Sequence, residues 1–309
     1  MYIGIDLGGT SIKAGIVTLY DSNVYDHKNI PTPISEGKEA VLEAIYDLIK
    51  TFDLSEIKGI GIGSAGSIDP ETRDILYSPN LFHDLFPLGT FLREKYEIPV
   101  MVENDVRVAA LAEHHYYYKS IRNFICIYLG TGIGSGIIVD GKLLSGCSNA
   151  AGEVGHMVIN ARGSLCACGN NGCFEAEASG QGVLRKARKA LESERKGLLF
   201  EKYNRDKASL LIRDIKEAAL KGDPLASNLW EEFIFFLSLG ISNIMTIFNP
   251  EVIVLGGGVL ESNPEIIDEV IKQAWKSANP VSARTCSLTK VNLGKKASIL
   301  GAGLLFLEY

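Results

Sequence analysis

The segment YIGIDLGGTSIKAGIV, residues 2–17, contains two short apolar runs separated by a pair of glycines. Apolar runs of this length on either side of a glycine turn predict two strands joined by a tight bend. The same pattern returns as FICIYLGTGIGSGIIV at residues 124–139. Each copy is followed by another strand-like run that ends in glycines, IKGIGIGSAG at 57–66 and EVIVLGGGV at 251–259. The sequence therefore predicts an internal duplication, with four glycine-rich strand ends around one cleft.

Segments with helical periodicity fill most of the remaining chain. Apolar residues recur at helical spacing in 37–52, 105–118, 178–191, 207–221, 225–248, 264–277 and 297–308. The alternation of strands and helices predicts an α/β protein built in layers. Because 309 residues are many for one hydrophobic core, we expect two domains. The strongly charged segment 189–208 is predicted to be a solvated helix end and a connection.

Charge and hydropathy argue against two classes of partner. The chain has 31 Lys and Arg and 37 Asp and Glu, which gives a net charge of −6 without a long basic run. Electrostatic binding to nucleic acid requires clustered positive charge, so we expect no nucleic-acid partner. The most apolar stretch, Phe233–Phe248, is interrupted by Ser, Gly and Asn and is shorter than the roughly 20 residues of a membrane span. It is predicted to be a buried core helix, with no membrane partner.

The N-terminal segment MYIGIDLGGTSIK lacks the basic region and the cleavage-site pattern of a secretory signal. We therefore expect it to form the first strand of the mature fold, and we expect a cytoplasmic protein. In a reducing compartment the six cysteines are not expected to form disulfides. Cys126, Cys147 and Cys286 lie among apolar or small residues and are predicted to be buried.

The glycine-rich loops predict phosphate binding. GIGSAG at 61–66 has the spacing of a dinucleotide-binding loop, but Pro70, Pro79 and the lack of an apolar stripe exclude the helix that must follow. In DLGGT, residues 6–10, the N–H groups of the bend, the threonine hydroxyl and the aspartate suit a metal-bound phosphate. LGTGIGSG at 129–136 repeats the arrangement. Two ordinary hairpin turns are the alternative, but the duplicated threonine favours a nucleotide phosphate site.

Three cysteines and one histidine form a second motif. His156, Cys166, Cys168 and Cys173 have the spacing His-x9-Cys-x-Cys-x4-Cys. Three thiolates and one imidazole are the donors of a closed structural zinc site. A redox role requires a Cys-x-x-Cys pair, which the motif lacks, and buried free thiols do not fit a segment rich in Asn and Gly. We therefore predict a structural zinc ion, which leaves one ring nitrogen of His156 for another partner.

The segment VMVENDVRVAALAEHHYYY, residues 100–118, predicts a strand that runs directly into a helix. Asn104 is a suitable N-cap and Asp105 falls in the first turn, so capping alone would explain both residues. The helix dipole also favours an ionised carboxylate at this position. Phosphoryl transfer needs such a group to orient the acceptor hydroxyl and accept its proton. From the residues alone, both roles of Asp105 stay open.

Several motifs together resemble one known family. They are IGIDLGGTSIKAGIV (3–17), VENDVRVAALAE (102–113), LGTGIGSGIIVDGKLLSG (129–146), AGEVGHM (151–157) and CACGNNGCFEAEASG (166–180). With this combination the chain resembles the ROK family of sugar kinases, within the actin-like ATPase and sugar kinase superfamily. The resemblance implies an α/β, actin-like (ribonuclease H-like) fold with ATP and sugar in an interdomain cleft. The expected domains are residues 1–119 with 297–309, and residues 120–296 with the zinc loop.

The resemblance also implies the site residues. Those implied to bind ATP and magnesium are Asp6, Gly8, Gly9, Thr10, Lys13, Gly130, Thr131, Gly132, Gly134, Gly256, Gly257 and Gly258. Those implied to bind the sugar are Gly66, Asn80, Asn104, Asp105, Glu153, His156 and Glu175. Asp105 matches the catalytic base of the family, and His156 is implied to contact the sugar as well as zinc. Members of the family often form dimers, so we expect a homodimer.

The predicted activity is ATP-dependent phosphorylation of a hexose, with glucose as acceptor at its 6-hydroxyl. Three departures from the family pattern border the implied sugar site. Ala65 replaces a proline, NLFHDL from Asn80 replaces Asn-Leu-Pro-Gly-Trp, and Asn149 stands where glycine is common. Asn tolerates left-handed backbone geometry, so the turn at Asn149 is expected to persist. A kinase of N-acetylglucosamine, N-acetylmannosamine or fructose is the first alternative.

Two alternatives without catalysis are a sugar-responsive transcription repressor and a sugar-binding protein that has lost activity. Repressors of the family carry a helix-turn-helix domain before the kinase-like part. Here DLGGT begins at residue 6, and no basic patch is present in the sequence. The presence of Asp6, Thr10 and Asp105 argues against lost catalysis. We therefore expect an enzyme.

Overall fold

The structure is a computed structural model that describes residues 1–307. Residues 308–309, which belong to the smaller predicted domain and include the end of the predicted C-terminal helix, lie outside the described residues. The chain folds into two compact units. Unit 1 consists of Met1–Cys126, Gly136–Gly152 and the described part of Val291–Tyr309, and unit 2 consists of Ile127–Ser135 and Glu153–Lys290. The domain ranges expected from the sequence stay a prediction.

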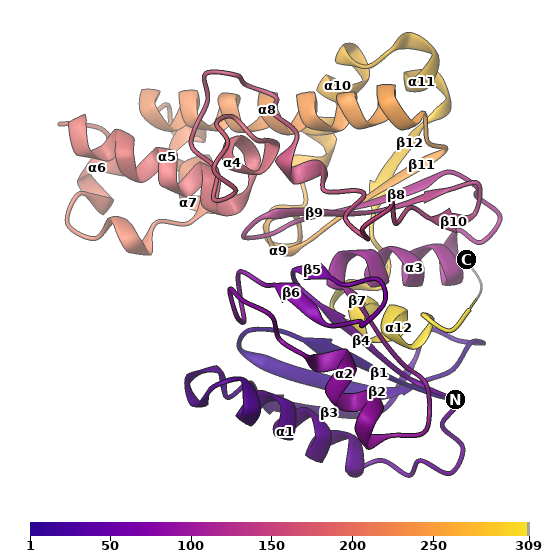
Figure 1. Cartoon of the computed structure of the whole chain (residues 1–309). Coiled ribbons are helices and arrows are strands. Elements are labelled where there is room, and N and C mark those ends of the chain that lie inside the picture. Colours follow the sequence, from indigo (N-terminus) through magenta and orange to yellow (C-terminus); the bar gives the residue numbers. More distant parts are fainter. Residues whose placement is uncertain (308–309) are drawn as a thin grey trace. The chain divides into compact units, whose positions relative to one another are not determined.

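Groups of strands and groups of helices alternate along the chain (Figure 1). The strands are β1 (Tyr2–Leu7), β2 (Ser11–Val17), β3 (Val24–Pro31), β4 (Ile60–Ser64), β5 (Ser67–Ile68), β6 (Ile75–Tyr77), β7 (Val100–Asn104), β8 (Phe124–Leu129), β9 (Ile133–Val139), β10 (Lys142–Leu143), β11 (Val252–Gly256) and β12 (Ser287–Lys290). The helices are α1 (Lys38–Lys50), α2 (Leu88–Lys95), α3 (Asp105–Tyr117), α4 (Phe174–Ala178), α5 (Gly180–Ser193), α6 (Leu198–Tyr203), α7 (Ile212–Leu220), α8 (Pro224–Phe248), α9 (Gly258–Ser262), α10 (Ile266–Ser277), α11 (Pro280–Thr285) and α12 (Ala297–Gly303).

Two five-stranded sheets have the same strand order. The first is β3-β2-β1-β4-β7, and the second is β10-β9-β8-β11-β12. In the first sheet, β1 and β2 are antiparallel, whereas β1, β4 and β7 run parallel. In the second sheet, β9 and β10 are antiparallel and β11 and β12 are parallel. The shared order confirms the internal duplication predicted from the repeated glycine turns.

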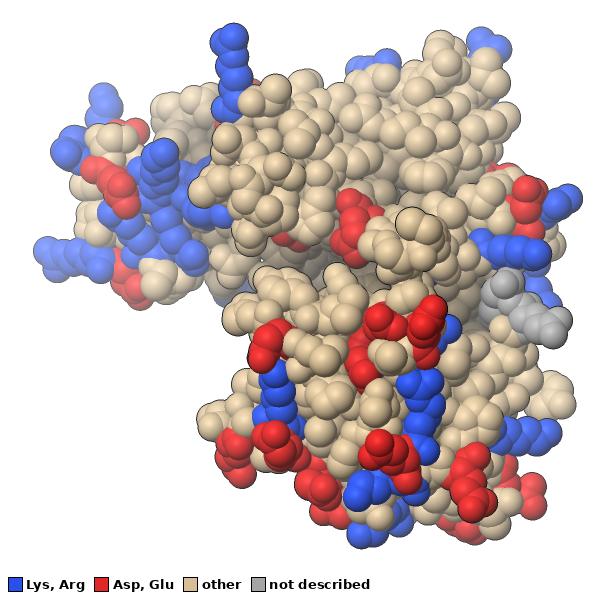
Figure 2. All heavy atoms as spheres, in the orientation of Figure 1, with Lys and Arg blue, Asp and Glu red and all other residues tan. Residues whose placement is uncertain are grey.

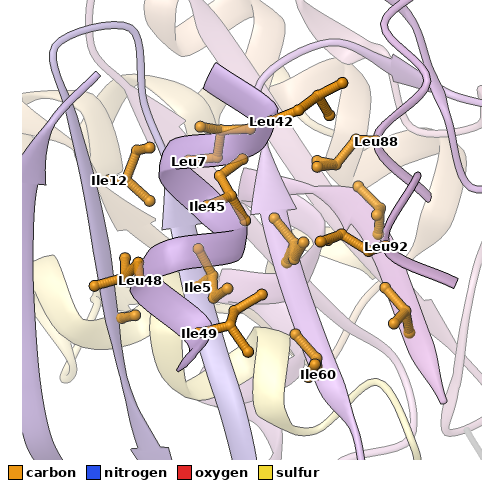
Figure 3. Close-up of a cluster of buried hydrophobic side chains, with 14 of the residues drawn as sticks. Ile5, Leu7, Ile12, Leu42, Ile45, Leu48, Ile49, Ile60, Leu88 and Leu92 are labelled. Atoms are coloured by element: carbon orange, nitrogen blue, oxygen red, sulfur yellow. The ribbon is translucent and has the colours of Figure 1, made fainter. Parts of the chain in front are cut away.

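The core of unit 1 lies between the first sheet and α1. Side chains alternate along a strand, so Ile3, Ile5 and Leu7 of β1 all point to one face, where they are buried. The apolar stripe of α1 contributes Ile45 and Ile49, which are fully buried. Figure 3 shows Ile5, Leu7, Ile45 and Ile49 turned toward one another between the helix and the strands. This packing explains why the helical period at 37–52 is visible in the sequence.

The opposite face of the same strands carries glycine, and α12 lies directly on it. A Cβ atom on Gly4 of β1 would lie 2.0 Å from the carbonyl oxygen of Ile299. A Cβ atom on Gly61 of β4 would lie 1.8 Å from the carbonyl oxygen of Ala302. Both distances are far inside van der Waals contact, so no larger residue fits. The two glycines therefore set how closely the C-terminal helix approaches the sheet.

In unit 2 the longest helix, α8, is a core element. Phe174 of α4 packs on it at Gly240, where a Cβ atom would lie 2.4 Å from the phenylalanine ring. Among residues 1–307, this is the one helix long and apolar enough to cross a membrane by length and hydropathy. However, 56% of its apolar window is buried inside the structure. That burial fits the core helix predicted for Phe233–Phe248.

Three local predictions can be compared with the structure. GIGSAG is followed by β5 and not by a helix, which confirms the argument against a dinucleotide loop. Cys126 and Cys286 are buried, but the predicted burial of Cys147 is wrong, because Cys147 lies exposed in a turn between Gly146 and Asn149. Segment 189–208 is not merely a solvated connection. It contains α6, whose Leu199 and Tyr203 are buried, and a helix this short gives too little periodicity to detect.

We predict that Gly61→Ala lowers the free energy of unfolding by about 1–3 kcal/mol or more, because the new methyl group must displace the backbone of α12. Urea unfolding followed by circular dichroism measures this loss. Gly258→Ala is the matched control, since no atom lies within 4 Å of a Cβ at that position. Equal stability of Gly61→Ala and the unmodified protein would contradict the close contact.

Candidate functional site

The carboxyl ends of three parallel strands in unit 1 bring two predicted site residues to one edge of the first sheet. Leu7 of β1 pairs with Ser64 of β4, and Ser64 pairs with Asn104 of β7. Asp6 therefore lies at this edge, and Asp105 follows directly after the end of β7. Ligands of open α/β sheets bind at the carboxyl ends of the strands. The register thus places the predicted phosphate loop and the predicted catalytic base at the same edge of the sheet, with β4 between their strands.

Asp6 is held by two donors. Lys13, its cross-strand neighbour on β2, donates to Oδ2 at 3.1 Å, and Ser298 at the start of α12 donates to Oδ1 at 2.9 Å. Asp6 shares the face of β1 on which Gly4 meets α12, which is why Ser298 reaches it. Each carboxylate oxygen accepts one hydrogen bond and keeps a lone pair for a further donor or a hard cation.

The first glycine loop is tied to its surroundings through the backbone. The N–H of Gly8 donates to the Ser11 carbonyl at 3.1 Å, and the Thr32 hydroxyl donates to the Gly8 carbonyl at 2.7 Å. Gly9 lies against Asn80, since a Cβ at Gly9 would be 2.5 Å from the Asn80 carbonyl oxygen. Asn80, predicted to contact sugar, thus adjoins the loop predicted to contact phosphate.

The start of α3 is capped as the sequence predicts. The Asn104 side-chain oxygen accepts hydrogen bonds from the N–H groups of Val106 at 3.0 Å and Arg107 at 3.2 Å. Its amide nitrogen donates to the Gly66 carbonyl at 3.3 Å, so two predicted sugar-binding positions are in contact. Asp105 is half-buried in the first turn, and its Oδ1 accepts from the Val106 N–H at 2.9 Å. Capping by Asn104 is confirmed.

A buried charged network stands behind this helix start. Glu103 accepts a hydrogen bond from the backbone N–H of Asn104 at 2.7 Å and pairs with Arg107 at 3.2 Å. Asn149 donates to Glu103 at 3.1 Å, and its carbonyl and side-chain oxygens both accept from Arg107 at 2.8 Å. Asn149 has a φ of 60°, the left-handed geometry expected for it. This departure from the family pattern therefore has a local structural role.

In unit 2, the predicted metal ligands converge. The ligand atoms of His156, Cys166, Cys168 and Cys173 all lie within 4.8 Å of one another. His156 Nδ1 is 3.7 Å from Cys166 Sγ, and the sulfurs of Cys168 and Cys173 are 3.6 Å apart. Two sulfurs that each bind a tetrahedral zinc ion at about 2.3 Å lie about 3.8 Å apart. The donor set and its spacing fit a zinc ion, with the Nε2 atom of His156 on the far side of the ring.

The three thiols differ in their environments. Burial raises the pKa of Cys173 to about 12 and also raises the pKa of Cys166. A hydrogen bond from the Asn170 backbone lowers the pKa of the exposed Cys168. Without a cation, neighbouring thiolates repel one another, so the cluster retains protons that a bound metal would displace.

The loop around the cluster is fixed by short-range contacts. Gly172 has a φ of 72°, and a Cβ there would lie 1.5 Å from the Asn160 carbonyl oxygen. Buried Glu177 of α4 accepts from the Ser164 N–H and from Lys186 of α5, each at 2.5 Å. Figure 2 shows Lys and Arg side chains gathered over α5, α6 and α7, the region of the helix that carries Lys186. The loop is thus anchored to two helices of unit 2.

The second glycine loop is held by the residues that follow the cluster. Glu175 of α4 accepts from the Ile133 N–H at 3.0 Å, and a Cβ at Gly132 would lie 2.2 Å from the same carboxylate oxygen. The Gly180 N–H at the start of α5 donates to the Gly130 carbonyl at 2.9 Å. Gly257 adjoins the end of β8, since its Cβ would be 2.4 Å from the Leu129 carbonyl oxygen. Unit 2 therefore brings its predicted ATP positions together with one predicted sugar position.

The remaining predicted residues take clear positions. Thr10 closes the first loop and accepts from the Thr32 N–H through its carbonyl, whereas Thr131 and Gly134 lie in and just after the second bend. Gly256 and Gly258 end β11 and begin α9. Glu153 precedes the 3-10 turn Val154–His156, and its carbonyl accepts from the His156 N–H at 3.0 Å. Ser298 and Thr32 were not predicted as site residues. Their role is visible only in the folded chain, where Ser298 contacts Asp6 and Thr32 contacts Gly8.

The comparisons with known proteins agree over the whole chain. Residues 2–309 match the ROK family profile. A glucokinase from Halalkalibacterium halodurans is 32% identical over 315 residues, covering 98% of this chain and 94% of that protein. A xylose repressor from Bacillus spizizenii is 30% identical, covering 99% of this chain and 77% of that protein.

Solved structures give the same result. A ROK hexokinase from Thermus thermophilus has a TM-score of 0.82 and 30% identity, covering 98% of this chain and 96% of that chain. A ROK family glucokinase from Streptomyces griseus, in complex with glucose and AMPPNP, has a TM-score of 0.79 and 30% identity, covering 98% of each chain. The likeness confirms the predicted actin-like fold. The chain belongs to the ROK family.

Proposed function

We propose that this ROK-family sugar kinase transfers the γ-phosphoryl group of ATP to the 6-hydroxyl of a hexose, with glucose as the preferred acceptor. The observation that carries the proposal is the register of the first sheet, which aligns Asp6 and Asp105 at one edge. The strands β1 and β7 are second neighbours in the sheet, so the two strands are separated by about 10 Å. That spacing accommodates a phosphoryl group next to an acceptor hydroxyl.

Asp105 is assigned the role of base. A carboxylate in the first turn of α3 is favoured in its ionised form by the helix dipole. From there it accepts the proton of the 6-hydroxyl as the oxygen attacks phosphorus, and Asn104 and Gly66 orient the sugar beside it. Magnesium bound with ATP would neutralise charge on the phosphates, and Asp6 is the residue suited to hold it, directly or through water. The N–H group of Gly9, with Thr10 and Lys13, would bind phosphate oxygens, whereas Gly8 would shape the bend, because its own N–H donates to the Ser11 carbonyl.

Unit 2 is assigned further contacts to the same substrates. Glu153, His156 and Glu175 would bind sugar hydroxyls, and the loops at Gly130 and Gly256 would bind the nucleotide. Zinc in the cysteine cluster is proposed to be structural, because four protein donors leave no open position on a tetrahedral ion. Its role is to fix the ring of His156 and the start of α4, which carries Glu175. The proposal also includes a cytoplasmic location and a homodimeric state.

The activity is tested by ADP release from the purified full chain over a sugar panel. We expect the highest kcat/KM with glucose, lower values with fructose, N-acetylglucosamine and N-acetylmannosamine, and no ADP release with 6-deoxyglucose, which lacks the acceptor hydroxyl. Preference for another sugar would overturn the assignment of glucose as the preferred acceptor, but it would still support kinase activity. Because repressors occur among the relatives, xylose belongs in the panel, and sugar binding without ADP release would overturn the activity.

Asp105→Asn tests the base directly. Asparagine still accepts the Val106 N–H but cannot accept the hydroxyl proton, so kcat should fall by about 10²–10⁴-fold while glucose binding changes little. Steady-state kinetics and calorimetric glucose titration separate the two effects. Asp47→Asn, at an exposed position on α1, is the control and should leave kcat unchanged. An unaltered kcat for Asp105→Asn would refute the assigned role.

Cys168→Ser tests the zinc site. Metal analysis should show bound zinc in the unmodified protein and its loss in the variant, together with weaker glucose binding and a lower melting temperature. Each thiol that binds as thiolate releases a proton, so zinc affinity should rise with pH from 6 to 8. Cys147→Ser removes an exposed thiol outside the cluster and should retain the metal. Full glucose affinity in a verified zinc-free protein would contradict the structural role.

A further inference from the structure

A cavity of about 260 Å³ lies within unit 1, and its wall contains none of the residues assigned to ATP, sugar or zinc. Its polar side is formed by Arg73 and Glu103. Its apolar side is formed by Met101, Leu111, Leu143 and Leu305. The cavity therefore combines one charged end with a hydrocarbon surface, which is the usual composition of a site for a small organic molecule.

The strand alternation of β7 explains where the cavity forms. Val100 and Val102 are buried on the α1 side of the sheet, so Met101 and Glu103 point to the side covered by α12 and α3. On that side α12 packs against the glycines of β1 and β4. The helix ends at Gly303, and Leu305 after it reaches the cavity wall. The face of β7 beyond α12 is thus left partly open.

The charges at the polar end are unequally satisfied. Glu103 is buried and accepts hydrogen bonds from Asn104 and Asn149 besides its ion pair with Arg107. The Arg73 guanidinium lies 4.0 Å from Glu103, and within residues 1–307 this is the one ion pair of that guanidinium. Its side chain is only 23% exposed and carries five N–H donors. Two guanidinium groups surround one carboxylate, so the local charge favours an anion.

We propose that this cavity is an effector site for a small organic anion. A carboxylate or phosphate monoester would pair with Arg73, and a short hydrocarbon tail would lie on Met101, Leu111, Leu143 and Leu305. The route to catalysis is short, because Glu103 in the cavity wall accepts the backbone N–H of Asn104, the cap of the helix that begins with Asp105. The effector role rests on the proposed kinase activity, whereas binding of the anion does not.

Binding is tested by calorimetry with the full chain and four probes. Hexanoate and hexyl phosphate represent the two anion classes, 1-hexanol lacks the charge, and acetate lacks the tail. We expect one or both six-carbon anions to bind and the other two probes to bind far more weakly. Loss of the charge-assisted hydrogen bonds in Arg73→Ala should weaken binding roughly 10- to 100-fold. Failure of both six-carbon anions to bind would overturn the proposal.

Three variants make the assignment specific. Leu143→Phe should block the tail without touching Arg73, and Arg73→Lys should keep part of the affinity, which preserves the test if Arg73→Ala does not fold. Arg122→Ala removes an exposed arginine elsewhere in unit 1 and should bind as the unmodified protein does. Equal affinity of Arg73→Ala and Arg122→Ala for the six-carbon anions would overturn the assignment of the site to this cavity.

The effector role has its own readout. A saturating concentration of the bound anion should change the kcat or the sugar KM of the unmodified protein and leave Arg73→Ala unaffected, while the basal kinetics of that variant should stay normal. Binding without any kinetic change would overturn the effector role. Absence of turnover with every sugar, combined with Arg73-dependent binding, would instead count against the kinase assignment alone.

Discussion

The close approach of α12 to the first sheet is the contact on which the geometry of unit 1 depends. It is possible only because Gly4 and Gly61 present bare backbone at the places where the helix carbonyls meet the strands. Gly301 permits an equally close contact between α12 and α3 at Val108. As a result, one short helix positions Ser298 against Asp6 and supports the helix that begins with Asp105. The predicted phosphate loop and the proposed catalytic base therefore depend on the same packed layer.

The two sheets share their strand order but hold their glycine loops by different means. In the first sheet the loop is tied by Thr32 and Asn80, and its aspartate is fixed by Lys13 and Ser298. In the second, the loop is held by Glu175 and by the start of α5, which follow the cysteine cluster in sequence. A metal that orders this cluster would thus stabilise the second loop indirectly, through Glu175 and the start of α5.

Local patterns in the sequence predicted the features that depend on neighbours in the chain. The glycine turns at 2–17 and 124–139 indicated the duplicated strands, the apolar period indicated α1 and α8, and Asn104 indicated the cap of α3. Contacts between distant segments could not be predicted in this way. Ser298 resembles any polar residue at a helix start, and the network of Glu103, Arg107 and Asn149 joins positions more than 40 residues apart. Cys147 was misjudged because its neighbours suggested burial, whereas the backbone turns it outward.

The pairing of Asp6 with Ser298 has a consequence for biosynthesis. The two residues are 292 positions apart, so β1 leaves the ribosome long before α12 is made. Until that helix arrives, the glycine-bearing face of β1 and β4 lacks its cover, and such long-range closure is slow. A prematurely terminated chain would contain every residue of both glycine loops yet lack the support for Asp6. With Asp6 in its proposed role, chains released before α12 is made would lack an ordered nucleotide site.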